Sequence, residues 1–161
     1  EFQRRLHVLK LMDEHCQRGS TILDLGAQPF IISCALGKMG YRVIAYDYDP
    51  EPYMEIAKLC GVEVMRCDLE RDSLGMQSTA DCIVFSEVLE HLNPYYVGHT
   101  LTEMNKALKY GGKLILTTPN IASLFRRLKL LLGLQPQQQG HVHEYTKKKG
   151  EKFFNGQGFL F

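Results

Sequence analysis

The sequence predicts an α/β fold in which a doubly wound, mostly parallel sheet carries helices on both faces. Short apolar segments alternate with helical patterns along most of the 161 residues, and strand–helix–strand units of this length imply right-handed crossovers and parallel pairing. Three of the apolar segments also end in or close to an acid, at Asp24, Asp47 and Asp68. Because the carboxyl ends of parallel strands share one edge of the sheet, we expect these carboxylates to line a single polar ligand site.

The expected elements follow in order from the N-terminus. Residues 1–18 carry apolar side chains at helical spacing (Phe2, Leu6, Leu9, Met12) and predict an amphipathic helix. Strands are expected at 21–26, 42–47, 62–67, 82–86 and 113–118, and the helices between them at about 30–39, 49–60 and 93–110. Glycines follow these helices and are expected to end them. The fourth strand, CIVFS, is apolar almost throughout, as is typical of a central strand covered on both faces.

The length predicts one domain, residues 1–161. Within it we expect an N-terminal helix (1–19), a ligand-binding core (20–118), an insertion on the substrate side (119–145), and a last helix with the start of a further strand (146–161). That last strand, GFLF at 158–161, has no partner after it, so we expect the C-terminal strand pair to be incomplete.

Composition excludes several classes of protein. The net charge is +1, so no overall field attracts nucleic acid, and no run of 18 apolar residues predicts integral membrane contact. The N-terminus, EFQRRLHVLK, lacks the apolar stretch of a signal peptide. Five scattered cysteines form no CxxC pair, which indicates reduced thiols rather than a disulfide framework or a zinc site. We therefore expect a cytoplasmic protein without a nucleic-acid partner.

The loop after the first strand, Gly26-Ala27-Gln28-Pro29-Phe30, narrows the choice of ligand. Gly26 lets the backbone turn tightly and approach a ligand closely. A dinucleotide-binding GxGxxG would need glycines where this chain has Gln28 and Ile31. The sequence therefore favours a ligand with a single carboxylate over one with a pyrophosphate.

Two of the strand-end acids each have a functional and a structural interpretation. Asp47 ends the second strand, where a carboxylate can accept hydrogen bonds from both ribose hydroxyls; the alternative is that it caps the next helix. Asp68 ends the third strand and can accept a bond from an exocyclic adenine amine; the alternative is a turn residue in CDLERD. We favour the functional interpretation of both.

Taken together, TILDLGAQPF, VIAYDYDPE, VMRCDLE, ADCIVFSEVLEHL and GGKLILTTPN resemble the class I S-adenosylmethionine-dependent methyltransferases. The resemblance spans residues 1 to about 145 and is closest to the small-molecule subgroup with EVLEHL-type and GHVHEYT-type segments. It implies a Rossmann-like, seven-stranded sheet and S-adenosyl-L-methionine as cofactor. It also implies methyl transfer to a small-molecule, glycan or lipid-precursor acceptor, with oxygen as our expected acceptor atom.

The resemblance implies a role for each residue of the cofactor site. The loop at Gly26 would face the methionine part, with Asp24 ordering its amino group; Asp47 would hold the ribose. Asp68 and Leu69 would contact adenine, and Ser86 and Glu87 would lie beside the sulfonium. Three further residues of the same loops complete the expected site: Ala27, Gln28 and Tyr48. The chain departs from the family at Gln28 and Phe30, where glycines are usual, so Gln28 either adds a polar contact or narrows the pocket.

The acceptor side is less defined. His91, His141 and His143 are the candidates for a catalytic base, because an imidazole titrates near neutral pH. If the SEVLEH segment is helical, Glu87 and His91 share one face. An alternative is a metal at Glu87, Glu90, His91 and a late histidine, as in metal-dependent RNA 2′-O-methyltransferases; we expect no metal. A second alternative is a non-catalytic binding module on the same fold.

The segment IASLFRRLKLLLG at 121–133 predicts an amphipathic helix next to the active-site edge. Three alternatives stay open for its apolar face. It packs on the domain or on a second subunit of a homodimer, it closes over the substrate as a lid, or it contacts a membrane surface.

Overall fold

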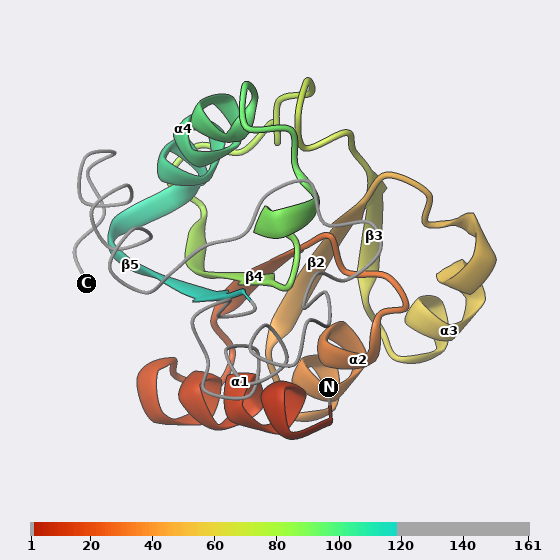
Figure 1. The fold of residues 1–161 in the computed structure, drawn as a ribbon. Helices are drawn as coiled ribbons and strands as arrows, with labels where there is room; N and C mark the ends of the chain where they lie inside the picture. Colours follow the sequence, from red (N-terminus) through yellow and green to blue (C-terminus); the bar gives the residue numbers. More distant parts are fainter. Residues whose placement is uncertain (1, 119–161) are drawn as a thin grey trace, which may run out of the picture.

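The computed structural model describes residues 2–118, which form a parallel sheet with helices on both sides (Figure 1). The helices are α1 (Phe2–His15), α2 (Ile31–Lys38), α3 (Met54–Leu59) and α4 (Val97–Ala107), with short 3₁₀ turns η1 (Glu51–Tyr53) and η2 (Leu89–His91). The strands are β1 (Thr21–Leu25), β2 (Arg42–Asp47), β3 (Glu63–Arg66), β4 (Ala80–Ser86) and β5 (Leu108–Thr117).

The sheet has the order β3-β2-β1-β4-β5, and every neighbouring pair is parallel. The chain starts in the middle at β1, winds outward to β3, then returns to the other side of β1 with β4. This reversal beside β1 leaves a crevice at the carboxyl edge, where doubly wound sheets bind ligands. The predicted fold class is confirmed for the described residues.

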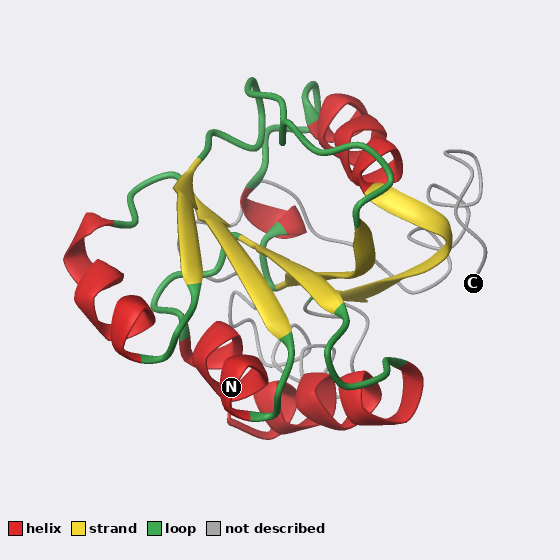
Figure 2. Cartoon of the chain, turned by 180° about the vertical axis from the view of Figure 1, so that it is seen from behind, coloured by secondary structure: helices red, strands yellow, loops and turns green. Residues whose placement is uncertain are grey.

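Alternating side chains along the strands build one core on each face of the sheet. In β4, Cys82 and Val84 pack with α1, α2 and α3, whereas Ile83 and Phe85 pack with α4. Figure 2 shows the same division, with α4 on one side of the sheet and α1 on the other. Residues 82–85 of β4 are therefore buried on both faces of the sheet, which is why this stretch is apolar.

The predicted apolar face of the N-terminal helix is partly wrong. Val8 and Met12 of α1 are fully buried, but Phe2 and Leu6 are 69% and 44% exposed. The second half of α1 thus contacts the domain core, through Val8 and Met12 and the partly buried Leu9 and Leu11. The first turn extends past that core and reaches the carboxyl edge of the sheet, where Arg4 and Arg5 line a cavity.

Three predicted boundaries are also corrected. The helix expected at 93–110 covers only Val97–Ala107, because the Asn93 side chain accepts the Tyr95 amide at 3.1 Å in a turn before it. The chain then becomes extended at Leu108, so β5 spans ten residues and its pairing with β4 shifts between Ala80 and Cys82. The helix expected at 49–60 is divided into η1 and α3.

Several predictions lie outside the described residues. They are the insertion at 119–145 with its apolar helix, and the last helix and strand at 146–161.

All five cysteines are free, and Cys67 and Cys82 are buried while the other three are partly buried. Within residues 2–118, no helix is long and apolar enough to cross a membrane.

Candidate functional site

The carboxyl edge of the sheet carries two hollows that meet at Gly26. The first, the Asp24 cavity, has a volume of about 330 Å³. The second, the Asp68 hollow, has a volume of about 320 Å³ and also contains Asp47. The Asp24 cavity is lined by polar residues of α1, β1 and the segment after β4, among them Arg4, Arg5, Ser86, Glu87, Glu90 and His91. The Asp68 hollow is lined by Tyr48, Cys67, Leu69, Glu70, Val88 and Leu92 in addition to the two aspartates and Gly26.

Gly26 leaves space at the junction between the two hollows because it has no side chain. Its φ of 68° lies in the left-handed region, which favours glycine, and its N–H donates to the Tyr46 carbonyl at 2.8 Å. A Cβ atom at this position would lie 2.5 Å from Val88 Cγ2, far inside van der Waals contact. A side chain at residue 26 would therefore fill the space between β1 and the segment after β4.

Asp24 is buried, with 3% exposure, and faces the α2 side of the sheet. The Ser33 hydroxyl donates to its Oδ2 at 2.5 Å. Burial raises the pKa of Asp24 to about 6, and the nearby charge of Asp47 adds to the rise, while the Ser33 hydrogen bond opposes it. A cationic group in the Asp24 cavity would compensate this buried carboxylate.

Asp47 holds the loop that follows β1. Its Oδ2 accepts the Gln28 amide at 2.8 Å and its Oδ1 accepts the Asp49 amide at 3.1 Å. The next helical turn begins after Pro50 without a side-chain cap, so the helix-capping alternative for Asp47 is not observed. A carboxylate oxygen can accept more than one hydrogen bond. Asp47 is therefore still able to accept hydrogen bonds from hydroxyl groups in the Asp68 hollow.

Gln28 turns its side chain toward β2 rather than filling the Asp24 cavity. Its Nε2 donates to the Asp49 carbonyl at 2.7 Å. Ala27, beside it, is 7% exposed, and Tyr48, at the end of the Asp68 hollow, is 69% exposed. The backbone of Gln28 thus supports Asp47, while its side chain ties the loop after β1 to the loop after β2.

Asp68 shows features of both interpretations. Its Oδ1 accepts the Glu70 amide at 3.0 Å, which is the local turn contact of CDLERD. Arg71 Nε lies 3.9 Å from its Oδ2. Asp68 nevertheless lines the hollow together with the buried Leu69. The turn orders the carboxylate at the rim of the hollow.

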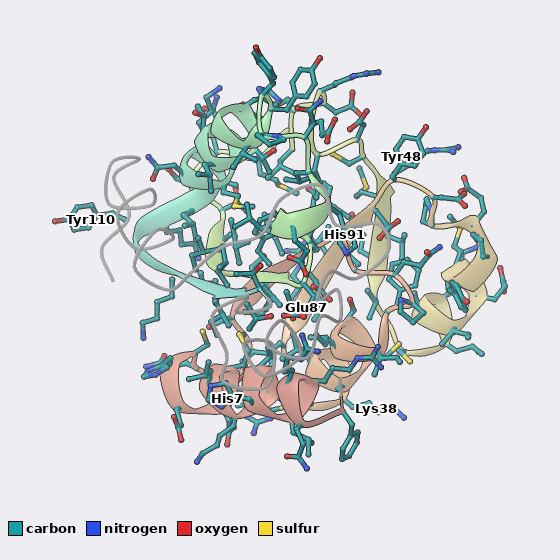
Figure 3. The ribbon with its side chains drawn as sticks, viewed as in Figure 1. His7, Lys38, Tyr48, Glu87, His91 and Tyr110 are labelled. Atoms are coloured by element: carbon teal, nitrogen blue, oxygen red, sulfur yellow. The ribbon has the colours of Figure 1, made fainter. Side chains whose placement is uncertain are left out.

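The segment after β4 departs from the helical geometry that the sequence suggested. Glu87 has a φ of 59°, and its N–H donates to the Thr117 carbonyl of β5 at 2.8 Å, not to a helical partner. Only the short turn η2 follows, so Glu87 and His91 do not share a helix face. Both still line the Asp24 cavity, and Figure 3 shows them near the centre of the molecule, well away from the peripheral Tyr110.

The side chains of Ser86 and Glu87 differ in their hydrogen bonding. The Ser86 and Thr117 hydroxyls lie 2.8 Å apart and are hydrogen-bonded. Glu87 Oε2 pairs with Arg4 of α1. Its Oε1 is buried and has no hydrogen-bond partner within the described part of the chain. A buried carboxylate oxygen without a donor is costly, so it marks a place where a ligand group would be favourable.

Three lining residues were not predicted for the cofactor or base roles. Glu90, considered only as a metal ligand, is 1% exposed and accepts the Thr118 hydroxyl at 3.1 Å. Burial raises its pKa, and the Glu87 charge adds to the rise. Arg4 and Arg5 resemble an ordinary solvated helix start in the sequence, so nothing in the local pattern distinguishes them.

The three histidines predicted as candidates for a catalytic base fall into two groups. His91 lines the Asp24 cavity, whereas His141 and His143 lie outside the described residues. Among residues 2–118, no group of three His, Cys, Asp or Glu side chains is placed to hold a metal ion. The arrangement instead suits an elongated ligand with a polar ring at Asp68, a diol at Asp47 and a cationic end at Asp24.

Comparison with known proteins agrees with the observed fold. A family profile described as a methyltransferase domain matches residues 2–160. A search of curated proteins finds no match. A crystal structure of a protein from Pyrococcus horikoshii is 26% identical with a TM-score of 0.67; the match covers 80% of this chain and 63% of that one. The chain thus spans less than two thirds of that protein.

Two further solved structures share the fold at lower identity. The first is 1,6-didemethyltoxoflavin-N1-methyltransferase from Burkholderia thailandensis with S-adenosylhomocysteine, at 16% identity and TM-score 0.76, covering 97% of this chain and 67% of that one. The second is magnesium protoporphyrin IX methyltransferase from Synechocystis with S-adenosylhomocysteine, at 20% identity and TM-score 0.74, covering 98% and 72%.

Proposed function

The chain belongs to the class I S-adenosylmethionine-dependent methyltransferases, and we propose that it transfers a methyl group from S-adenosyl-L-methionine to an oxygen atom of a small organic acceptor. The observation that carries this proposal is the pair of hollows joined at Gly26, with one strand-end aspartate for each polar part of the donor. Adenine fits beside Asp68 and Leu69, the ribose diol fits Asp47, and the amino group fits Asp24.

The buried polar atoms and the space at Gly26 both fit this donor. Glycine leaves room for a narrow linker where a Cβ would collide with Val88. Asp24 is buried without a cationic partner among the interactions of the described residues, and the donor's ammonium would supply one. The donor carries a sulfonium methyl group, whose transfer to a nucleophile needs alignment more than bond activation.

The chain's own residues would orient the acceptor and take its proton. As the S–CH₃ bond breaks and the O–CH₃ bond forms, the hydroxyl proton must leave the acceptor oxygen. Glu90 and His91 line the Asp24 cavity, which would hold the acceptor beside the amino-acid part of the donor. The raised pKa of Glu90 makes it a better proton acceptor than an exposed carboxylate. We assign proton removal to these two groups, and His141 and His143 stay candidates for the same role.

Two structural relatives and the net charge of the chain support a small acceptor. Two of the structural relatives are named for small-molecule substrates, a toxoflavin precursor and a magnesium porphyrin. The net charge of +1 offers no field for a nucleic-acid chain. A small molecule or a glycan or lipid precursor is therefore the acceptor class that we propose.

Calorimetric titration with S-adenosylhomocysteine tests donor binding. We expect micromolar affinity for the wild type and a loss of about tenfold or more for Asp47→Asn, because an amide accepts fewer hydrogen bonds than a carboxylate. Asp49→Asn is the matched control, since no hydrogen bond of its side chain is observed in the described residues. If the folded wild type gives no heat of binding, the proposal is wrong and the non-catalytic binding module is favoured.

Transfer of a tritiated methyl group from the donor tests the acceptor. We expect label to appear in hydroxyl-bearing small molecules, with glycan and lipid precursors included in the screen, and the label to stay in an alkali-resistant ether. Label in amines alone would overturn the choice of oxygen. Activity on RNA that is lost with a chelator would replace the proposal with the metal-dependent alternative.

A further inference from the structure

We propose that Glu87 makes the site select the cationic methyl donor over its neutral product. The proposal rests on the proposed function and concerns one atom, the buried Oε1 of Glu87, which has no hydrogen-bond partner in residues 2–118. A donor with a sulfonium differs from S-adenosylhomocysteine by one positive charge at the sulfur. A carboxylate beside the sulfur therefore binds the two ligands differently, whereas one at the ribose or the amino group does not.

The position of Glu87 follows from the order of the hollows. The donor's sulfur lies between its ribose and its amino-acid part, so it must pass the junction at Gly26, between Asp47 and Asp24. The junction is formed on one side by Gly26 and on the other by Val88, the neighbour of Glu87. Glu87 itself lines the Asp24 cavity, and it precedes Val88 in the chain. It is thus the acidic side chain adjacent in sequence to the junction.

The backbone of Glu87 is fixed in a conformation that non-glycine residues rarely adopt. Its φ of 59° is held by the hydrogen bond from its N–H to the Thr117 carbonyl. Such strain costs about 1 kcal/mol or more and tends to occur where function requires it. The side chain is 26% exposed, so much of the Glu87 carboxylate is withdrawn from water and its field is less screened.

The ion pair with Arg4 determines how strongly Glu87 favours the cationic donor over the neutral product. The Arg4 guanidinium pairs with Oε2 of Glu87 and so neutralises part of the carboxylate charge. Oε1 is left for the ligand. Removing Arg4 should make the carboxylate a stronger counter-charge, and removing the Glu87 charge should abolish the selection. The two substitutions therefore have opposite expected effects.

The test compares dissociation constants for S-adenosylmethionine and S-adenosylhomocysteine by calorimetry. The ratio of the two constants cancels any effect of a variant on the shared adenosine and amino-acid parts. For Glu87→Gln we expect the preference for the cationic donor to fall about tenfold relative to wild type, as for a partly screened charge a few ångströms away. For Arg4→Gln we expect the preference to rise. The remote, exposed Glu63→Gln is the matched control and should leave the ratio unchanged.

The outcomes separate this proposal from the proposed function. An unchanged ratio in Glu87→Gln, with both ligands still bound, overturns the selection by Glu87 and leaves donor binding intact. Equal losses of both ligands would place Glu87 at the amino group instead, and would also overturn it. Absence of binding by the wild type would overturn the proposed function itself. Retained binding of S-adenosylhomocysteine shows that each variant is folded.

Discussion

At the scale of single residues, the site depends on carboxylates that are each held by a different kind of partner. Asp24 is bonded to a serine hydroxyl, Asp47 to two backbone amides, and Glu87 to an arginine. These partners decide how much of each charge is left for a ligand. Burial raises the pKa of Asp24 to about 6, and the hydrogen bonds from the side chain and the backbone of Ser33 only limit the rise.

The raised pKa of Asp24 predicts that donor binding weakens in acid. A cationic amino group binds the ionised carboxylate, so affinity should be constant above about pH 7 and fall as the pH drops through 6, because Asp24 must then lose a proton to bind. We expect roughly a tenfold loss per pH unit below 6. Titration of S-adenosylhomocysteine between pH 5 and 8 measures it.

Asp24→Asn is the control for this pH dependence. The amide does not titrate, so the variant should bind weakly with little change across the range. Equal pH dependence in the variant and the wild type would show that another group is responsible, and would remove Asp24 from the amino-group role.

The sequence identified the strand-end acids but not the residues that face them. Asp24, Asp47 and Asp68 were predictable because a regular sheet brings the ends of its strands to one edge. Arg4 and Arg5 were not, because their place depends on how far α1 extends beyond its buried Val8 and Met12. The position of Glu87 was likewise set by a long-range bond to Thr117 that no local pattern encodes.

At the scale of elements, α4 is joined to the segment before β4 by one carboxylate. Glu103 of α4 accepts the Ser73 hydroxyl at 2.5 Å and the Leu74 amide at 3.2 Å, and it pairs with Lys106 at 2.7 Å. The Lys106 hydrogen bond and then the Ser73 bond lower the pKa of Glu103 to about 2. These interactions hold Ser73 and Leu74, in the segment after Asp68, against α4.

Loss of the Glu103 charge should destabilise the domain. Glu103→Gln is expected to lower the free energy of unfolding by about 1–3 kcal/mol at pH 7, because it weakens charged hydrogen bonds of a buried group. The folded pKa lies below the usual 4.5, so this stability is present above about pH 4.5 and is lost as the pH falls toward 2. Urea unfolding at pH 7 and pH 3 measures both effects.

The exposed pair Glu55–Lys58 provides the matched control, since it has the same spacing on α3 but a side chain that is 85% exposed at Glu55. Glu55→Gln should change the unfolding free energy little. A similar loss in both variants would contradict the role given to burial of Glu103.

Element positions were more predictable than their ends. The strands were placed from short apolar segments bounded by glycines and acids, and all five exist. The ends of the helix before β5 were wrong because the Asn93 turn delays its start and the chain becomes extended at Leu108, before Gly111. Both events depend on side-chain bonding and strand pairing rather than on helical periodicity.

At the scale of the whole molecule, the two hollows act as one site only if a single ligand spans them. The doubly wound order places β1 at the centre, so Gly26, which follows β1, lies between the carboxyl ends of β2 and β4. Family membership was predictable because several weak motifs occurred in the order of the fold. The acceptor was not, because residues expected to contact it lie in α1 and in 119–145, and no pattern in these segments specifies an acceptor.

Titration with S-adenosylhomocysteine and with 5′-methylthioadenosine, which lacks the amino-acid end, tests the continuity of the site most directly. The two ligands share the adenosine part, which we propose to bind in the Asp68 hollow. The account predicts that S-adenosylhomocysteine binds at least about tenfold more tightly, since only it reaches Asp24. Equal affinities would contradict a donor site that runs through Gly26 into the Asp24 cavity.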